Sequence, residues 1–411
     1  MIRSFDIIIV GSGPAGLACT AELADSKLNI ALISKHFDFE KFDVKGTSLE
    51  MIREFDLEDC VLTKHARFNV YSRTQHTIGY LREEKACVVD FYRVLKTLLK
   101  RTKCTRIQNE VIRVFRNQNG VTVEDVSGKQ YHTRLLIDCS GTSFISLPLT
   151  GVNRPKAFFQ CLSIIFENCT IPHENLNGIS FYMDPEICNS AVWFYPISTS
   201  RCQLGLGDMA PYVTTDKGDL HKRLMIATQL YPFKKMLQSA KANLESTVYC
   251  HNPVIQPLER MQADNVMVAG DAAGMATPLM GDGVRPALYG GSEAAKVAKV
   301  AFRNNDLSEN FLTQHEKMWW ERLGKYYIWT MLMRHFICLD FSASDWDEIV
   351  KNLKKLSPDE FYSAISSKMT REIFFKLMDF KIFEDIVIKT IEQKIPHLSY
   401  LNKRHFTSNI I

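Results

Sequence analysis

The sequence lacks the patterns that mark several common protein classes. Its eleven cysteines are scattered singly and form no Cys-x-x-Cys pair, which argues against a disulfide framework and for reduced thiols. No His/Cys cluster has the spacing of a zinc site, so we expect no bound metal. No window of about 18 apolar residues is uninterrupted, so we expect no membrane-spanning helix. The N-terminal "MIRSFDIIIVGSG" runs into glycines after four apolar residues, unlike a secretory signal.

The net charge is also small, at +4 over 411 residues. This balance gives no argument for nucleic-acid binding, although a weak attraction to anionic membranes remains open. The most apolar segment, Tyr326 to Phe341, is interrupted by Arg334, His335 and Asp340. We interpret it as a core helix, with an interfacial helix as the alternative. We therefore expect a cytoplasmic protein, with membrane association left open.

The order of the apolar segments predicts a discontinuous architecture. A buried strand "FDIIIV", a helix and a second strand "LNIALIS" form a βαβ unit at the N-terminus. A helix capped by Asp90, a β-meander, a strand-rich region with one helix, a second βα segment and a helical end follow. The length also implies several domains. We predict an FAD-binding domain in 1–65, 86–145 and 258–306, a sheet-based substrate domain in 66–85 and 146–257, and a helical cap in 307–411.

A G-x-G-x-x-G pattern follows the first predicted strand. Its first glycine permits a tight turn, the second lets the backbone approach a pyrophosphate, and the third allows close helix–strand packing. The phosphate charge is then stabilised by the amides and dipole of a helix N-terminus. Because the pattern lies between a strand and a helix, it favours dinucleotide binding over a glycine-rich turn that binds nothing. The expected cofactor contacts here are Gly11, Gly13, Pro14, Ala15 and Gly16.

The second predicted strand ends without the acidic residue that usually holds the adenosine ribose. Ser34 stands at that point, and Lys35 follows it. Ser34 can hydrogen-bond a ribose hydroxyl, whereas Lys35 would indicate the phosphorylated ribose of NADP. We favour the ribose contact, because the chain has further features that a nicotinamide dinucleotide does not require.

These features indicate FAD. Asp271 lies between an apolar strand and a small-residue helix start, where an acidic side chain needs a partner such as the hydroxyls of a ribityl chain. Beyond it, a proline and a Gly-x-Gly loop can bring backbone amides to the edge of a flat ring. Arg93 lies on the helix after the βαβ unit, and "DCSGTS" ends a meander strand. The remaining expected cofactor residues are Gly46, Arg93, Val111, Gly270, Asp271, Pro278, Gly281, Asp282, Gly283 and Val284.

The order of these motifs resembles the FAD-dependent monooxygenases and reductases with the fold of the aromatic hydroxylases. Within that superfamily, "FYMDPEICNSAVWFYPISTSRCQLGLG" is similar to the Y-x-G-P…G-Y-x-W-x-F-P signature of the geranylgeranyl reductase branch. The resemblance covers about residues 5 to 300. It implies an α/β fold: a Rossmann-like FAD-binding domain, a mixed-sheet substrate domain and a C-terminal helical region. It also implies substrate contacts at Tyr182, Trp193, Tyr195 and Pro196, although core packing alone would also explain these aromatic residues.

The sequence departs from that branch at a loop near the expected flavin. Many of those reductases carry Pro-Cys-Gly there, but Val44 and Lys45 precede Gly46 in this chain, which puts a thiol-dependent mechanism in doubt. Met280 is bulky where the loop is otherwise small. Flavin-dependent halogenases are the second resemblance, with one of their two tryptophans present at Trp193. Their essential lysine has no clear counterpart, although Lys45 and Lys64 are candidates, and the acidic segment of lycopene cyclases is absent.

The predicted function is therefore an FAD-dependent oxidoreductase. The resemblance implies reduction of C=C bonds in an apolar, prenyl-type substrate by hydride transfer from reduced flavin. The alternative is a monooxygenase or halogenase that acts through a C4a-hydroperoxide, and a flavoprotein that only binds or senses is a third class. No second G-x-G-x-x-G is present, so electrons would come from transient NAD(P)H, a flavin reductase or a ferredoxin. The catalytic residues are not identified from the sequence.

Overall fold

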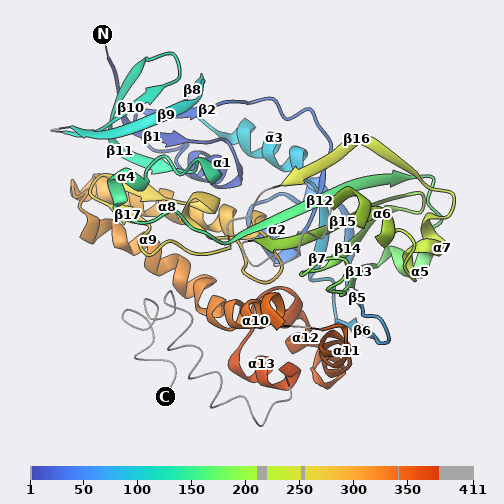
Figure 1. The fold of residues 1–411 in the computed structure, drawn as a ribbon. Coiled ribbons are helices and arrows are strands. Elements are labelled where there is room, and N and C mark those ends of the chain that lie inside the picture. Colours follow the sequence, from blue (N-terminus) through green and yellow to red (C-terminus); the bar gives the residue numbers. More distant parts are fainter. Residues whose placement is uncertain (1, 118, 211–219, 251–254, 341, 379–411) are drawn as a thin grey trace.

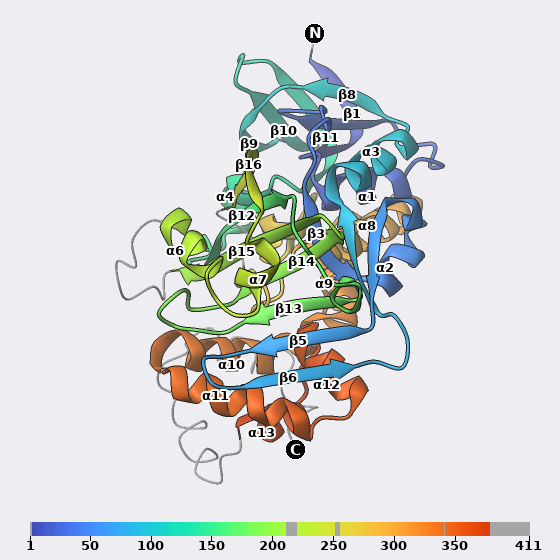
Figure 2. The ribbon, with the colours of Figure 1, turned by 90° about the vertical axis from the view of Figure 1, so that its right-hand side faces the viewer.

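The computed structural model describes residues 2–117, 119–210, 220–250, 255–340 and 342–378. Within these ranges the chain forms an eight-stranded sheet, a seven-stranded sheet, a three-stranded sheet and several helices. Figure 2 shows the eight-stranded sheet at the top, the seven-stranded sheet in the middle and the C-terminal helices at the bottom. The predicted α/β class with a Rossmann-like N-terminal unit is confirmed.

The eight-stranded sheet is built on the N-terminal βαβ unit. Its order is β17-β18-β11-β1-β2-β8, with β10 and β9 added by antiparallel pairing onto β11. Strand β1 pairs in parallel with both β2 and β11, and all its residues from Ile7 to Val10 are buried, as expected for a strand covered on both faces. The strands are β1 (Arg3–Val10), β2 (Ile30–Ser34), β8 (Thr105–Gln108), β9 (Val111–Asn117), β10 (Gly120–Asp125), β11 (Gln130–Asp138), β17 (Gln262–Ala263) and β18 (Val266–Val268).

The predicted meander is shorter than the sequence indicated. Strands β9, β10 and β11 form antiparallel neighbours, but β8 pairs in parallel with β2 instead. Parallel pairing needs a crossover connection, and helix α3 (Phe91–Arg101) precedes β8 and provides it. The helix begins where predicted, because the Asp90 side chain accepts a hydrogen bond from the Arg93 backbone N–H.

Two helices lie directly against each other beside this sheet, as Figure 1 shows: α1 (Pro14–Glu22) and α8 (Val284–Asn304). They approach closely because Gly291 of α8 lies on the backbone of α1. A Cβ atom added at Gly291 would lie 2.0 Å from the carbonyl oxygen of Ala15. Helix α9 (Glu309–Arg322) packs against α8 on its other side. This packing fixes the start of α8 beside the start of α1.

The seven-stranded sheet has the order β16-β12-β15-β14-β13-β5-β6. Its strands are β5 (Arg67–Tyr71), β6 (His76–Tyr80), β12 (Phe158–Glu167), β13 (Gly178–Tyr182), β14 (Val192–Ser198), β15 (Arg201–Ala210) and β16 (Lys241–Cys250). The small sheet β3-β7-β4 joins the two larger ones; its strands are β3 (Val44–Ser48), β4 (Val61–His65) and β7 (Ala86–Asp90). Short helices between strands are α2 (Leu49–Glu54), α4 (Leu147–Thr150) and α5 (His173–Leu176).

One predicted helix of this region is two helices. The sequence indicated a single helix near 218–237, but the structure has α6 (Leu220–Ala227) and α7 (Phe233–Leu237). Pro232 lies between them and directly precedes α7, and a proline interrupts the helical hydrogen-bond ladder. The first two residues of the predicted helix fall outside the described residues.

The C-terminal helices pack beside β5 and β6 at the far edge of the seven-stranded sheet (Figures 1 and 2). They are α10 (Tyr327–Asp340), α11 (Ala343–Asn352), α12 (Pro358–Ile365) and α13 (Arg371–Met378). In α10, Leu332 and Met333 are buried in the core shared with β5, so this segment packs as a core helix. Among the described helices, none is both long enough and apolar enough to cross a membrane. The predicted cap beyond residue 378 lies outside the described residues, and the predicted three-domain division stays a prediction.

One buried carboxyl in α8 gives the stability of the fold a pH dependence. Burial raises the pKa of Glu293 to about 7, and the negative charge of Glu54 adds to this rise. The positive charges of Arg322, whose guanidinium lies 3.6 Å away, and of Lys296 oppose it. Below its usual pKa the group is protonated in both the folded and the unfolded chain. As the pH rises from there towards 7, only the unfolded chain gains by ionising, so the fold loses stability.

We therefore expect wild-type protein to lose at most about 3 kcal/mol of unfolding free energy through this group between pH 5 and 8. A Glu293→Gln variant should lose correspondingly less over the same range. Denaturant titrations at both pH values measure the difference, and Glu321→Gln, at an exposed position of the neighbouring helix α9, is the matched control. Equal pH dependence in the Glu293 variant and the wild type would contradict the assignment.

Candidate functional site

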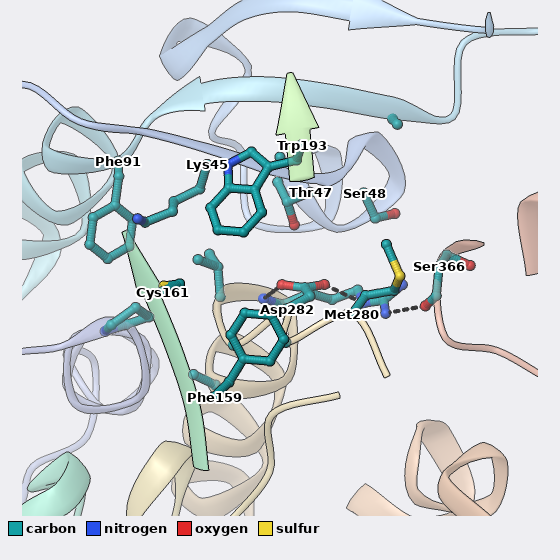
Figure 3. A pocket seen from close by; sticks show the side chains of 18 of the residues that line it. Lys45, Thr47, Ser48, Phe91, Phe159, Cys161, Trp193, Met280, Asp282 and Ser366 are labelled. Carbon is teal, nitrogen blue, oxygen red and sulfur yellow. Dashed lines mark hydrogen bonds and ion pairs between the residues drawn. The ribbon is translucent and has the colours of Figure 1, made fainter. Parts of the chain in front are cut away.

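A cavity of about 400 Å³ lies where the three sheets and the C-terminal helices meet. Its walls combine the start of α1, the start of α8, strand β3, and the strands β12 and β14 of the seven-stranded sheet. Figure 3 shows side chains from these separate elements pointing into one space. Of the residues predicted from the sequence, twelve line it: Gly13, Pro14, Ala15, Gly46, Trp193, Tyr195, Gly270, Asp271, Gly281, Asp282, Gly283 and Val284.

The glycine pattern after β1 has a distinct structural reason at each position. Gly11 has a φ of +104°, and a Cβ there would lie 2.2 Å from the carbonyl oxygen of Cys139. A Cβ on Gly16 would lie 1.9 Å from the carbonyl oxygen of Gly11. Gly13 differs, because no protein atom lies within 4 Å of the position its Cβ would take. Gly11 and Gly16 therefore serve the turn itself, while Gly13 leaves open space at the N-terminus of α1.

The second glycine-rich segment forms the opposite side of the cavity. Gly270 has a φ of +69° and lies against Ala15, so the two glycine-rich turns are in contact. Asp271 follows it and faces the cavity. Further on, Gly281 to Val284 line the cavity where α8 begins. Two helix N-termini thus open into one space, an arrangement that favours anionic and electron-rich groups there.

Aromatic side chains of the seven-stranded sheet line the other wall. Trp193 and Tyr195 alternate with the buried Phe194, which stacks on Phe233 on the opposite face of the sheet. Trp193 and Tyr195 therefore lie on the cavity face of β14, and Phe194 lies on the other face. Two glycines of the neighbouring strand β15 leave space for aromatic rings. A Cβ on Gly205 would lie 2.3 Å from the Trp193 ring, and one on Gly207 would lie 2.1 Å from the Phe159 ring.

Several predicted residues lie outside the cavity wall. Ser34 hydrogen-bonds the Ser12 hydroxyl at 2.7 Å, and Lys35 pairs with Glu110 at 2.6 Å, so each has a partner within the protein. Tyr182 packs against Phe233 on the opposite face of the seven-stranded sheet. The others not among the lining residues are Gly11, Gly16, Arg93, Val111, Pro196 and Pro278. Their assignments to cofactor or substrate stay predictions.

The sequence reasoning missed several polar and aromatic residues of the wall. Gln203 of β15 is the cross-strand partner of Tyr195 of β14. Phe159 and Cys161 lie two residues apart on β12, and both line the cavity. Because cross-strand partners share a face, the alternation of Trp193 and Tyr195 would have located Gln203 once the pairing was known. Lys45, proposed only as a halogenase-type candidate, lines the cavity, whereas the side chain of the other candidate, Lys64, is exposed.

A buried ion pair connects the cavity to the C-terminal helices. Arg285 lies 3.3 Å from the Asp282 carboxylate and donates a 2.6 Å hydrogen bond to the carbonyl oxygen of Ser366, just beyond α12. Burial raises the pKa of Asp282, and the Arg285 charge opposes that rise. Figure 3 shows the pair joining the Gly281–Gly283 loop to the Ser366 backbone. The C-terminal helices are thus fixed directly to the loop that lines the cavity.

A second, smaller cavity of about 60 Å³ adjoins the first. Side chains from α10, α11, α12 and α13 line one part of it, and strands and loops of the seven-stranded sheet region and the Gly270–Gly283 segment line the rest. Five of the lining residues are methionines: Met183, Met209, Met280, Met333 and Met369. The two cavities share a wall made of Phe181, Ser190, Ala191, Met280 and Ile365. The two cavities therefore lie next to each other, with mostly apolar residues common to both.

The arrangement fits FAD. Gly13 leaves space for a pyrophosphate at a helix N-terminus, Asp271 offers a carboxylate to hydroxyl groups, and the Gly281–Val284 backbone lies at the second helix start. The aromatic wall across from that backbone gives a flat ring and an apolar substrate a shared, largely apolar space. The groups present can bind, orient and exclude water from a cofactor-driven reaction.

Comparisons with known proteins agree with this geometry. The family model "Pyridine nucleotide-disulphide oxidoreductase" matches residues 5–176. Digeranylgeranylglycerophospholipid reductase 1 of Methanosphaera stadtmanae is 23% identical over 393 residues, covering 90% of this chain and 93% of the relative. The corresponding reductase of Methanocaldococcus jannaschii is 25% identical, covering 87% of this chain and 88% of its own.

Solved structures of other proteins share the fold of this chain. A geranylgeranyl bacteriochlorophyll reductase-like protein from Thermoplasma acidophilum superposes with a TM-score of 0.78 at 18% identity, covering 95% of this chain and 99% of that one. A flavin-dependent brominase superposes with a TM-score of 0.67 at 18% identity, covering 95% and 98% of the two chains. At such identities these likenesses concern the fold alone.

Proposed function

We propose that this chain, an FAD-dependent oxidoreductase of the aromatic-hydroxylase-like superfamily, reduces C=C bonds in an apolar, prenyl-type substrate. The predictions of an FAD-dependent enzyme and of a resemblance to the geranylgeranyl reductase branch are confirmed by the family match, the relatives and the fold. The relatives are named as reductases of a digeranylgeranyl lipid, so a prenyl chain is the first substrate class to test.

The observation that carries the proposal is that the two cavities lie next to each other and share a wall. The main cavity lies between the glycine turns and the aromatic wall, where the flavin and the reacting bond would be held together. A long prenyl chain needs more room than the main cavity offers beside the flavin. The second cavity lies next to the main cavity, on the other side of a mostly apolar wall. Apolar surface transferred into such a space contributes roughly 25 cal/mol per Å² to binding.

When bound, the flavin would supply the hydride. The chain's own residues would hold and surround the reactants: the backbone from Gly281 to Val284 would lie along the ring, and Asp271 would hold the ribityl hydroxyls. Three aromatic side chains would orient the prenyl substrate and keep water from the reacting bond: those of Trp193, Tyr195 and Phe159. Burial raises the pKa of Tyr195, so this phenol stays neutral.

We propose an external electron donor and a peripheral contact with the membrane that carries the substrate. The donor would be NAD(P)H bound transiently, a flavin reductase or a ferredoxin, because the sequence contains only one G-x-G-x-x-G pattern. The membrane contact would give a prenyl lipid a short route into the apolar cavities. The membrane contact follows from the substrate class, whereas the external donor follows from the single glycine pattern.

Anaerobic reduction of the purified yellow protein separates the candidate functions. The reduced protein is then mixed either with a polyprenyl lipid or with oxygen. Reoxidation by the lipid, with appearance of the saturated product, supports the proposal. Fast reoxidation by oxygen with hydroxylated or halogenated product would favour the oxygen-dependent alternative, towards which the brominase fold points. Reoxidation by neither above the rate of free flavin would exclude both enzymatic functions.

A Met280→Ala variant is expected to prefer longer chains. Met280 lies in the wall shared by both cavities, so its truncation would remove part of that wall and join the two spaces. A change of about one methylene in an apolar pocket alters selectivity roughly 10-fold or more, and we expect the preference for long over short polyprenyl ligands to rise by about that factor. Competition binding with ligands of graded length measures it.

Met183→Ala is the matched control, because Met183 lines the second cavity but not the main one. It should weaken the binding of long ligands without altering access to the second cavity. If both variants changed the preference for ligand length equally, the prenyl ligand would not pass Met280. The proposed extension of the substrate into the second cavity would then be wrong.

A further inference from the structure

Lys45 places an ammonium group in the main cavity. It is the second residue of β3 and directly precedes Gly46, which also lines the cavity. Its side chain is 28% exposed, and its Nζ lies 5.9 Å from the centre of the Phe91 ring. Figure 3 shows the Lys45 side chain extending from beside Trp193 towards the Phe91 ring. A charged group therefore stands among aromatic side chains where the substrate is proposed to react.

A buried network holds this ammonium in place. The Lys45 Nζ lies 2.8 Å from Oδ2 of Asp43, whose side chain is only 4% exposed. The other carboxylate oxygen, Oδ1, accepts hydrogen bonds from the backbone N–H of Val44 at 2.8 Å and from Nε2 of Gln203 at 2.9 Å. The amide oxygen of Gln203 in turn accepts from Nε1 of Trp193 at 3.4 Å. The network couples Lys45 on β3 to the aromatic wall on β14.

The Lys45–Asp43 ion pair carries no net charge, which favours a neutral ligand over a charged one. Asp43 already neutralises Lys45, so a carboxylate or phosphate brought next to them would leave a net negative charge in a largely apolar space, which is costly. A neutral carbonyl oxygen accepts a hydrogen bond from the ammonium without adding charge. An ammonium in such a place also stabilises negative charge that develops on that oxygen during reaction.

We propose that Lys45 is a catalytic residue that donates a hydrogen bond to a neutral carbonyl oxygen conjugated with the reacting C=C bond. The substrate class is then an α,β-unsaturated carbonyl compound on an apolar chain. This inference rests on the proposed function, which it makes more specific.

The flavin, when bound, would supply a hydride to the β carbon. The electrons of the C=C bond would then move towards the carbonyl carbon, and those of the C=O bond would move to oxygen. The oxygen takes a proton from Lys45 and gives an enol, which rearranges to the saturated carbonyl compound. Lys45 regains its proton from water. The sum is one hydride and one proton added across the former double bond.

Binding of unreactive ligands tests the assignment independently of turnover. The oxidised, FAD-loaded protein is titrated with a saturated long-chain methyl ketone, the matching alkane and the matching carboxylate. We expect wild-type protein to bind the ketone about 10-fold more tightly than the alkane, because a hydrogen bond to a charged group contributes roughly 1.5–3 kcal/mol. Lys45→Met should abolish that difference, Lys45→Arg should restore part of it, and Lys64→Met, at an exposed position of β4, should leave it unchanged.

Asp43→Asn removes the neutralising charge and should shift the preference from the ketone towards the carboxylate. In turnover, Lys45→Met should slow reduction of a polyprenal about 100-fold, whereas Lys64→Met should not. Tighter binding of the carboxylate than of the ketone by wild-type protein would overturn the inference, as would an unchanged ketone preference in Lys45→Met. If no C=C compound is reduced but the ketone preference still depends on Lys45, the proposed function fails and the carbonyl-binding role of Lys45 stands.

Discussion

A Gly13→Val variant is expected to fold and yet to be purified almost without FAD. Gly13 has φ −74° and ψ −177°, a conformation open to any residue, and no protein atom lies within 4 Å of the position of its Cβ. The valine methyl groups would instead enter the space at the N-terminus of α1, where we expect the pyrophosphate. A steric loss of about 3 kcal/mol there corresponds to roughly 100-fold weaker FAD binding.

Flavin absorbance per protein and calorimetric titration of FAD into apoprotein measure this effect, and circular dichroism reports whether the fold is kept. Gly13→Ala should show a smaller loss of affinity, since its single methyl group takes less of the space. Gly11→Ala is the structural comparator: at φ +104° and 2.2 Å from a backbone oxygen it should impair folding as well as FAD binding. A Gly13→Val protein that retains full FAD affinity would place the pyrophosphate elsewhere.

An Asp208→Ala variant is expected to be among the least stable single variants of the described chain. Asp208 of β15 and Arg223 of α6 form an ion pair of 2.6 Å, with side chains only 2% and 8% exposed. Asp208 also accepts from the backbone N–H of Asn189 at 2.8 Å, and Arg223 donates to the carbonyl oxygen of Ile187 at 2.7 Å. Removing one partner leaves a buried, uncompensated charge and costs about 3–5 kcal/mol.

The matched control is the exposed pair Lys103–Asp25, at 3.0 Å, with side chains 72% and 91% exposed. Asp25→Ala should leave the unfolding free energy nearly unchanged. A double-mutant cycle that includes Arg223→Met separates the ion pair from the loss of each side chain. If Asp208→Ala were no more destabilising than Asp25→Ala, the buried pair would not contribute to holding α6 on the sheet.

The local features of the cofactor side could be predicted from the sequence because short-range geometry decides them. The glycine turn needs a positive φ at Gly11 and bare backbone at Gly16, and both requirements are visible in six consecutive residues. The Asp90 cap and the βαβ unit depend on neighbours within a few turns. The small residues from Gly270 onwards likewise indicated that something approaches the backbone there.

The substrate side could be predicted only in part because long-range pairing decides it. Gln203 and Asp43 are 160 residues apart, yet their hydrogen bond positions the Lys45 ammonium. Tyr182 was grouped with Trp193 by motif, but it pairs with Val192 across β13 and β14. Cross-strand partners share a face of a sheet, so Tyr182 lies with Phe194 on the other side. A strand register, which no local pattern supplies, separates these residues.

The scattered origin of the main cavity has a consequence for how the protein is made. Strand β1 is synthesised first, but its neighbour β11 follows more than a hundred residues later, and the Gly270–Val284 segment that closes the cofactor side follows later still. At roughly 5–20 residues per second, a ribosome needs on the order of tens of seconds between the first glycine turn and the second. During that interval the nascent chain carries an apolar sheet that no cofactor can yet stabilise. The supply of FAD during expression should therefore improve the yield of completed chains, while truncated chains that end before residue 270 should gain nothing from it.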